Sequence, residues 1–333
     1  MATPFNVKGQ QGSIPSLGLG TATLFNNICK TTVFEAIKLG YRHIDTALLY
    51  DNQEAVGAGI AEAISAGFCT REDLFVTTKV GFYPAAADGA NCDVHIACHP
   101  ENKKGFAETA AAVDLCLSKL GLPYVDLVLV HNPCTTIAEY QASTCPHNFD
   151  LSKTRFTRAE RELILGGRLA QAHAAWDPDA ACAARAATWK ALEAAKGAGK
   201  ARFIGVSNYS PYLLKQMESY ATVAPAVNQL ELHPRASAPT LRALAAASGM
   251  ALTAYGTGNS VAIEKSPVVA AVAKKHGTSP VGVVIQWTLA RGVTVIPRTA
   301  TLSHMKENLE SAGKQSLLSA EDLAQLDALN DAY

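Results

Sequence analysis

Residues 124–133 read YVDLVLVHNP, a run that is apolar apart from Asp126 until it reaches His131. A β-strand buried on both faces has this composition, and such strands belong to parallel sheets that are covered by helices. The preceding segment Glu108–Leu120 has helical spacing and stops at Gly121, which can adopt the left-handed conformation that closes a helix. The stretch therefore predicts one helix followed by one buried parallel strand.

The same alternation extends outward over the chain. Short apolar runs predict eight strands at Ser16–Gly20, Tyr41–Asp45, Leu74–Lys79, Tyr124–His131, Ala201–Ser207, Ala224–Gln229, Met250–Tyr255 and Val293–Ile296. Helical stretches between them include Thr31–Leu39, Gln53–Ala66, a helix opened by Ser210 and Pro211, and Pro239–Ser248. Repeated β-then-α units predict an α/β fold, a (β/α)8 TIM barrel that forms a single domain over residues 1–333.

A doubly wound sheet is the rival architecture. It normally carries a G-x-G-x-x-G motif that opens a helix directly after its first strand. The segment LGLGT at residues 17–21 holds Gly18 and Gly20 but no third glycine at the required distance. The barrel is therefore the preferred prediction.

Composition excludes several classes of protein. The 333 residues are 48% hydrophobic and 17% charged, which excludes wholesale disorder. The formal net charge is +0, so the basic excess of a nucleic-acid binder is missing. No apolar run approaches the ~20 residues of a membrane helix, and MATPFNVKGQ does not resemble a secretory signal. We expect a cytoplasmic protein, and the neutral charge permits the monomer that we predict.

Two connections are too long for simple loops: residues 82–105 and 132–184. Loops of such length are usually functional, and loops after barrel strands lie at the C-terminal face, where ligands bind. We expect both insertions there, with some helix in RFTRAERELILGGRLAQAHAA at 155–175. We hypothesise that they pack on each other and form the substrate-facing wall.

The insertions also carry a cluster of possible metal ligands, namely Cys92, His95, Cys98, His99, Cys134, Cys145 and His147. Cysteine and histidine bind zinc when four of them converge. Their spacing matches no established metal motif, so we predict ordinary loop residues and no metal. A metal site and a disulfide are the open alternatives.

Polar side chains stand at the ends of neighbouring predicted strands. Asp45, Lys79 and His131 end the second, third and fourth strands, and Tyr50 follows Asp45 by five residues. A buried lysine and aspartate are tolerable as a pair, and an ammonium beside a tyrosine hydroxyl lowers its pKa from ~10. Tyr50 could then protonate an alkoxide while His131 orients the carbonyl oxygen. The alternative is a structural ion pair, a surface tyrosine and a satisfied histidine.

With these residues in place, the chain resembles the aldo-keto reductase family. The resemblance rests on motifs that cover nearly the whole chain outside the insertions: LGLGT at 17–21, GYRHIDTA with Tyr50 at 40–50, Lys79, VDLVLVHNP at 125–133, GVSNY at 205–209, VNQLELHP at 227–234, Tyr255 and IPRTATLSHMKENL at 296–309. It implies an NADPH-dependent reduction of an aldehyde or ketone, with NADH possible. Asp45, Tyr50, Lys79 and His131 would form the catalytic tetrad, with Tyr50 as general acid.

The resemblance also assigns cofactor contacts. It implies that Ser207, Asn208 and Gln229 hold the nicotinamide carboxamide and that Tyr255 stacks on its ring. The remaining implied cofactor residues are Gly20, Thr21, Arg298, Thr299, His304, Glu307 and Asn308. Backbone amides at the last barrel helix, with Arg298, would hold a ribose 2′-phosphate.

The chain departs from the family at several of these positions. Arg298 replaces the usual lysine and preserves phosphate binding, whereas His304 replaces an arginine and stacks less strongly. Ala22, Gly81 and Asn132 stand where animal relatives often have tryptophans. The expected lining of the substrate pocket comprises Ala22, Phe82, Tyr83 and Asn132.

A second function is open within the same fold. A regulatory or structural member of the family would keep the barrel and the cofactor but turn over slowly. The complete tetrad favours the enzyme, which would act on a small-molecule carbonyl substrate without nucleic acid or membrane partners.

Overall fold

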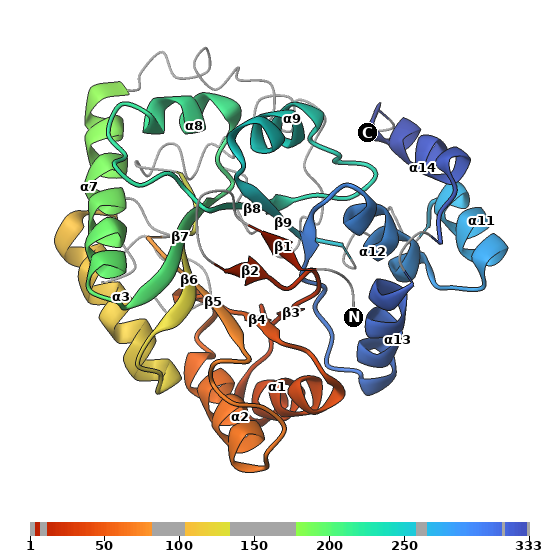
Figure 1. Ribbon diagram of the computed structural model, residues 1–333, viewed down its shortest axis with the longest axis horizontal. Coiled ribbons are helices and arrows are strands. Elements are labelled where there is room, and N and C mark those ends of the chain that lie inside the picture. Colours follow the sequence, from red (N-terminus) through yellow and green to blue (C-terminus); the bar gives the residue numbers. More distant parts are fainter. Residues whose placement is uncertain are drawn as a thin grey trace. The chain divides into compact units, whose positions relative to one another are not determined.

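The computed structural model describes residues 4–6, 12–81, 104–133, 178–257, 265–314 and 317–331 (Figure 1). Most of the two predicted insertions, including the helix expected at 155–175, lies outside the described residues. So do the seven cysteines and histidines of the insertion cluster. The second insertion is shorter than predicted, because helix α7 begins at Pro178 rather than after residue 184.

The main sheet has eight strands, and their spatial order is their order along the chain. They are β3 (Leu19–Gly20), β4 (His43–Asp45), β5 (Phe75–Val80), β6 (Val125–Val130), β7 (Ala201–Ser207), β8 (Val227–Glu231), β9 (Ala251–Tyr255) and β10 (Thr294–Val295). Parallel bridges Leu17↔Val295 and Gly20↔Arg298 link the first strand region to the last. The architecture confirms the predicted (β/α)8 fold.

The predicted strands agree with the observed ones to within a few residues, and one difference has a clear cause. The sixth predicted strand, Ala224–Gln229, is β8 and begins at Val227. Pro225 lacks a backbone N–H and cannot donate to a central sheet ladder, so pairing starts after it. By contrast, every residue of β5 and of β6 is buried, as expected for parallel strands covered on both faces.

Helices alternate with the strands. Their bounds are α1 (Asn26–Leu39), η1 (Leu48–Tyr50), α2 (Gln53–Ser65), α3 (Phe106–Leu120), α7 (Pro178–Gly197), α8 (Pro211–Met217), α9 (Pro239–Ser248), α11 (Pro267–His276), α12 (Pro280–Ala290), α13 (Leu302–Gly313), α14 (Ala320–Asp327) and η4 (Ala328–Asp331). Ser210 caps α8 by accepting a hydrogen bond from the Leu213 N–H, as its sequence predicts. The motifs did not predict the hairpin of β1 (Phe5–Asn6) and β2 (Ser13–Ile14).

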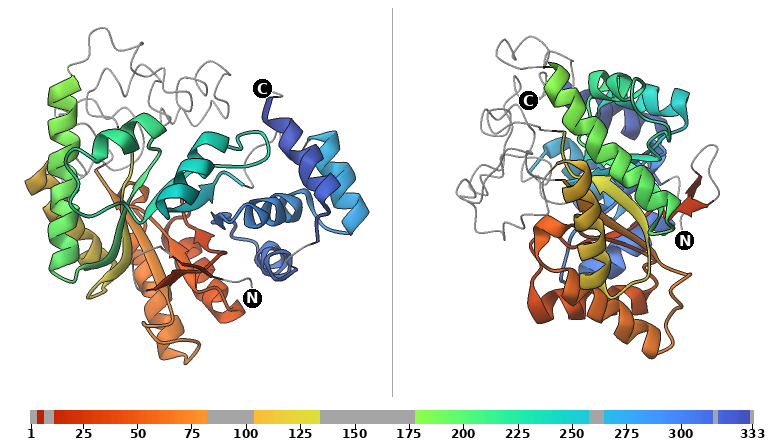
Figure 2. Two further views of the ribbon diagram at one scale, coloured as in Figure 1. Left: turned by 45° about the horizontal axis from the view of Figure 1, so that its top comes forward. Right: turned by 90° about the vertical axis from the view of Figure 1, so that its left-hand side faces the viewer.

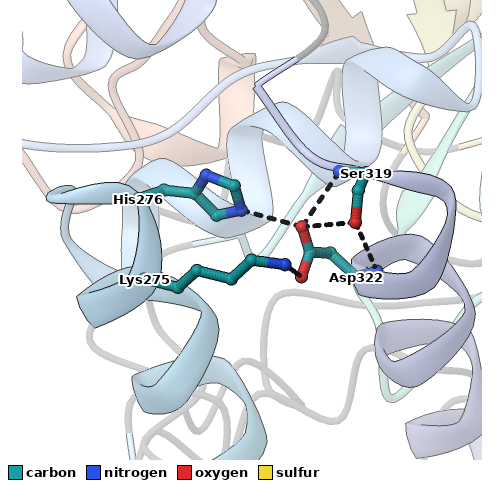
Figure 3. A network of polar contacts seen from close by, with 4 residues as sticks. All are labelled: Lys275, His276, Ser319 and Asp322. Atoms are coloured by element: carbon teal, nitrogen blue, oxygen red, sulfur yellow. Dashed lines mark hydrogen bonds and ion pairs between the residues drawn. The ribbon is translucent and has the colours of Figure 1, made fainter.

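The chain forms two compact units, and the first contains residues 1–45, 58–75 and 229–333. Within this unit, α11 and α14 lie side by side (Figure 2). The carboxylate of Asp322 at the start of α14 accepts from Lys275 Nζ at 2.7 Å and contacts His276 Nε2 at 2.7 Å (Figure 3). Asp322 and Ser319 also form a reciprocal capping box. One buried carboxylate therefore fastens the last helix to α11.

The second unit contains residues 46–57 and 76–228. Its helices α3 and α7 run side by side, and α7 packs on β6 and β7 (Figures 1 and 2). The fully buried carboxylate of Asp126 accepts from the Val76 N–H and from Arg202 Nη1, both at 2.9 Å. Asp126 in β6 thus ties the starts of β5 and β7 together. The prediction of a single domain spanning the whole chain stays a prediction.

The described cysteines Cys29, Cys69, Cys116 and Cys182 are all free thiols. Burial raises the pKa of the Cys116 thiol to about 11, so it stays protonated at neutral pH. Within the described ranges, no cluster of histidine, cysteine, aspartate and glutamate is arranged to hold a metal ion. In the same part of the chain, no helix combines the length and apolarity required to cross a membrane.

Candidate active site

Three of the four predicted catalytic side chains meet in the second unit. Lys79 Nζ donates to Tyr50 Oη at 3.2 Å and lies 4.9 Å from the centre of the tyrosine ring. The rings of Tyr50 and His131 meet edge to face, with centroids 5.7 Å apart. An ammonium at hydrogen-bond distance stabilises negative charge on the Tyr50 oxygen.

The strands set the positions of these side chains. Lys79 is the penultimate residue of β5, and His131 directly follows β6. The ladder pairs Lys79 with Leu129, and the His131 N–H continues it by donating to the Val80 carbonyl at 2.8 Å. Lys79 lies opposite Leu129, and His131 follows Leu129 by two residues. Since side chains alternate along a strand, the lysine and the histidine lie on the same face, near the C-terminal ends of the strands.

Tyr50 is positioned from the other side of this edge. It ends the short helix η1, three residues before α2 begins at Gln53. The Gln53 side chain donates to Thr78 Oγ1 at 2.6 Å and holds the segment after Tyr50 against β5. Lys79 Nζ also donates to the Thr46 carbonyl at 3.0 Å, an acceptor that sequence analysis did not reveal.

The Lys79 ammonium is buried, so its hydrogen bonds have to offset the cost of removing it from water. Lys79 is 1% exposed and His131 5%, whereas Tyr50 is half-buried. An ammonium taken out of water costs several kcal/mol unless it is paired and hydrogen-bonded. The Thr46 carbonyl and the Tyr50 hydroxyl supply two such partners, so they fix the position of the charge.

Asp45 belongs to the first unit, where it ends β4. Its Oδ2 accepts from Gln229 Nε2 at 2.8 Å, and its backbone carbonyl accepts from Thr21 Oγ1 at 2.9 Å. Three predicted site residues are thus brought together, one from the catalytic set and two from the cofactor set. The pairing of Asp45 with Lys79 stays a prediction.

The predicted carboxamide-binding pair lies at the end of β7. Ser207 is 1% exposed and Asn208 8%, and Asn208 adopts the left-handed conformation with φ 67°. Asn208 Nδ2 donates to Ser207 Oγ at 2.8 Å and to the His131 carbonyl at 3.1 Å. The pair is therefore held directly against the backbone of the predicted catalytic histidine.

The first unit contains another group of predicted cofactor residues, within or at the ends of its strands. Gln229 lies in β8, and Tyr255, half-buried, ends β9. Gly20 ends β3 so close to the next segment that an added Cβ would lie 2.8 Å from the Ile296 carbonyl oxygen. Only a glycine allows this approach of two strands.

The start of α13 has the chemistry of a phosphate site. Its N-cap residue Thr301 makes no side-chain cap, and the first turn contains no acidic residue. Unpaired N–H groups and the helix dipole favour an anion there. Arg298, three residues before the cap, is exposed and donates to Thr23 Oγ1 and to the Ala22 carbonyl. A guanidinium three residues before such a helix start is suited to an anionic group.

The other predicted residues around α13 differ in exposure. His304 is exposed, and its Nδ1 lies 3.5 Å from Thr299 Oγ1. Glu307 is half-buried. Asn308 is 4% exposed and hydrogen-bonds to Tyr41, so the structure gives it a contact in the core. A cofactor contact of Asn308 stays a prediction.

Two of the four predicted pocket residues can be described. Ala22 lies in the turn after β3, and Asn132 is fully buried beyond β6. Phe82 and Tyr83 lie outside the described residues. Asn132 Oδ1 accepts from Lys104 Nζ at 3.0 Å, and sequence analysis did not single out this lysine. Its position in a predicted loop, directly before a helix, carried no signal of burial.

The chain is similar to known proteins over nearly its whole length. Residues 16–331 match the Aldo/keto reductase family. The chain is 33% identical over 309 residues to the NAD(P)H-dependent D-xylose reductase of Scheffersomyces stipitis, covering 89% of this chain and 85% of that protein. It is 33% identical to the D-galacturonate reductase of Hypocrea jecorina over 89% of this chain and 82% of the other. The crystal structure of a Bombyx mori aldo-keto reductase in complex with NADP matches with a TM-score of 0.73 and 28% identity, covering 100% of this chain and 94% of that one.

Proposed function

Because the chain belongs to the aldo-keto reductase family and is an oxidoreductase, we propose that it reduces an aldehyde or ketone to the alcohol with NADPH. The observation that carries the proposal is the 3.2 Å contact of Lys79 Nζ with Tyr50 Oη, beside the ring of His131. The chemistry that a bound nicotinamide cofactor would supply is a hydride for the carbonyl carbon. The oxygen of that carbonyl gains negative charge and must be protonated.

The side chains divide this work. Tyr50 donates its hydroxyl proton to the developing alkoxide, and Lys79 stabilises the phenolate that remains. His131 donates a hydrogen bond to the carbonyl oxygen and orients it. Asp45 is the fourth member of the tetrad that the family implies.

The cofactor proposal follows the same residues. Ser207, Asn208 and Gln229 would bind the carboxamide, and Tyr255 would stack on the ring. The uncapped start of α13 and Arg298 favour NADPH over NADH, because the 2′-phosphate carries the charge that they attract. The names of relatives, such as the NAD(P)H-dependent D-xylose reductase, support use of either cofactor.

Arg298→Ala tests the phosphate site. We expect NADPH affinity to fall about 10- to 100-fold, because a charge-assisted hydrogen bond contributes roughly 1.5–3 kcal/mol, while NADH affinity changes less than about twofold. Fluorescence titration with both cofactors measures this. Lys306→Ala, at an exposed cation on α13, is the control. Equal losses for the two cofactors in Arg298→Ala would move the phosphate site elsewhere.

The activity itself is tested with a panel of carbonyl compounds. D-xylose and D-galacturonate are natural first choices because two relatives are named for them, and an activated aromatic aldehyde reports chemistry with little demand on the pocket. Each is assayed with NADPH and with NADH. Tight NADPH binding without turnover of any compound would favour the slow regulatory or structural alternative. The monomeric state and cytoplasmic location stay predictions.

A further inference from the structure

Lys104 is a buried cation that the proposed chemistry does not use. It precedes α3 by two residues and is 1% exposed, which places it among the largest fully buried side chains. Burying an ammonium costs several kcal/mol unless hydrogen bonds compensate for it. A surface lysine would avoid that cost, so the contacts made by Lys104 need a reason.

Those contacts lie directly beyond two predicted catalytic residues. Lys104 Nζ donates to the Gly81 carbonyl at 2.7 Å and to Asn132 Oδ1 at 3.0 Å. Gly81 follows Lys79 by two residues, and Asn132 follows His131 directly. One ammonium therefore connects the ends of β5 and β6 just past the lysine and the histidine.

The backbone next to Lys104 and at Gly81 is also constrained. Gly105, next to Lys104, donates its N–H to Thr188 Oγ1 of α7 at 3.0 Å. Gly81 has φ +66°, a conformation that glycine adopts readily and that other residues strain to reach. An added Cβ there would meet Thr188 Cγ2 at 3.5 Å and Lys104 Cγ at 3.8 Å. Gly81, Lys104 and Thr188 therefore form one local arrangement.

We propose that Lys104 is a positioning residue for the reduction, which ties Gly81 to Asn132 and so keeps Lys79 and His131 in register beneath the substrate carbonyl. The inference rests on the proposed function. It assigns to Lys104 no contact with substrate or cofactor. Misplacement of reacting groups by 1 Å can slow an enzyme about 10²-fold, so a link at this point affects rate more than binding.

The test uses Lys104→Met, which keeps the length of the side chain and removes its donors. We expect kcat to fall about 10- to 100-fold while the NADPH Kd and the substrate KM change less than about threefold. We also expect a larger primary isotope effect on kcat with NADPH deuterated at the transferred position, because the hydride step becomes slower. Lys200→Met, at an exposed lysine paired with Asp114, is the matched control.

Asn132→Ala provides a second, independent variant. It leaves Lys104 bound to Gly81 and removes one end of the connection, so we expect a smaller loss of kcat in the same direction. The double variant should be no slower than Lys104→Met alone, because both changes break the same link. If Lys104→Met does not fold, a loss of kcat with a raised isotope effect in Asn132→Ala still supports the inference.

If the wild-type protein is active, any one of three results would overturn the inference. The first is a kcat for folded Lys104→Met within twofold of that of Lys200→Met. The others are losses of kcat that multiply in the double variant, and an Asn132→Ala enzyme as fast as wild type. A wild-type protein that binds NADPH but reduces no carbonyl compound would instead refute the proposed function.

Discussion

Replacing Tyr50 with phenylalanine is expected to lower kcat for carbonyl reduction about 10²- to 10⁴-fold, the usual contribution of a positioned general acid. The substitution removes one oxygen and keeps the ring that packs against His131. The partner lost is the hydroxyl that lies 3.2 Å from Lys79 Nζ, while the Thr46 carbonyl still holds the ammonium. NADPH binding should therefore remain nearly intact. Steady-state kinetics and a fluorescence titration on the same preparation measure both effects.

Tyr212→Phe is the matched control, because Tyr212 on α8 is an exposed tyrosine in the same unit. It should retain wild-type activity. A Tyr50→Phe enzyme with full kcat would contradict the assignment of the general acid. A Tyr50→Phe enzyme that no longer binds NADPH would show that the hydroxyl supports the cofactor site rather than proton transfer.

Much of this geometry could be predicted because it depends on strand ends. The β-branched and apolar residues of β5 and β6 predict fully buried parallel strands and indicate where each one ends. Lys79 and His131 then follow as polar groups at one edge of the sheet. The helix ends at Gly121 and Gly249 could be predicted for a similar local reason, and both glycines adopt the left-handed conformation.

Lys104 could not be predicted in this way. A lysine in a long loop next to a glycine is usually solvated, and its composition gives no hint of burial. Its environment comes from the ends of β5 and β6 and, through Gly105, from Thr188 of α7, which lies 83 residues along the chain from Gly105. By contrast, the start of β8 at Val227 could have been predicted, because Pro225 cannot donate a hydrogen bond in a central strand.

Asp322→Ala is expected to lower the free energy of unfolding by about 2 kcal/mol at pH 7, since the change removes a helix cap and charge-assisted hydrogen bonds together. Asp322 is 2% exposed, and its carboxylate accepts from Lys275 Nζ and from Ser319 Oγ, with His276 Nε2 also at 2.7 Å (Figure 3). Asp114→Ala, which breaks an exposed pair with Lys200, should cost less than about 1 kcal/mol. Urea denaturation of both variants and the wild type measures the difference.

The pH dependence of that difference tests its electrostatic origin. Burial by itself raises the pKa of the Asp322 carboxyl, but hydrogen bonds from Lys275, Ser319 and His276 outweigh it and hold the pKa below its usual range. A depressed pKa in the folded state adds stability above the unfolded value of about 3.9, and this contribution is lost as the pH falls toward the folded pKa. The contribution of the Asp322 charge to the difference in free energy of unfolding between wild type and Asp322→Ala should therefore be constant from pH 7 to pH 5. This difference should then shrink by about 0.7 kcal/mol by pH 3.5. A difference that does not change on acidification would mean that packing, not charge, holds α14 in place.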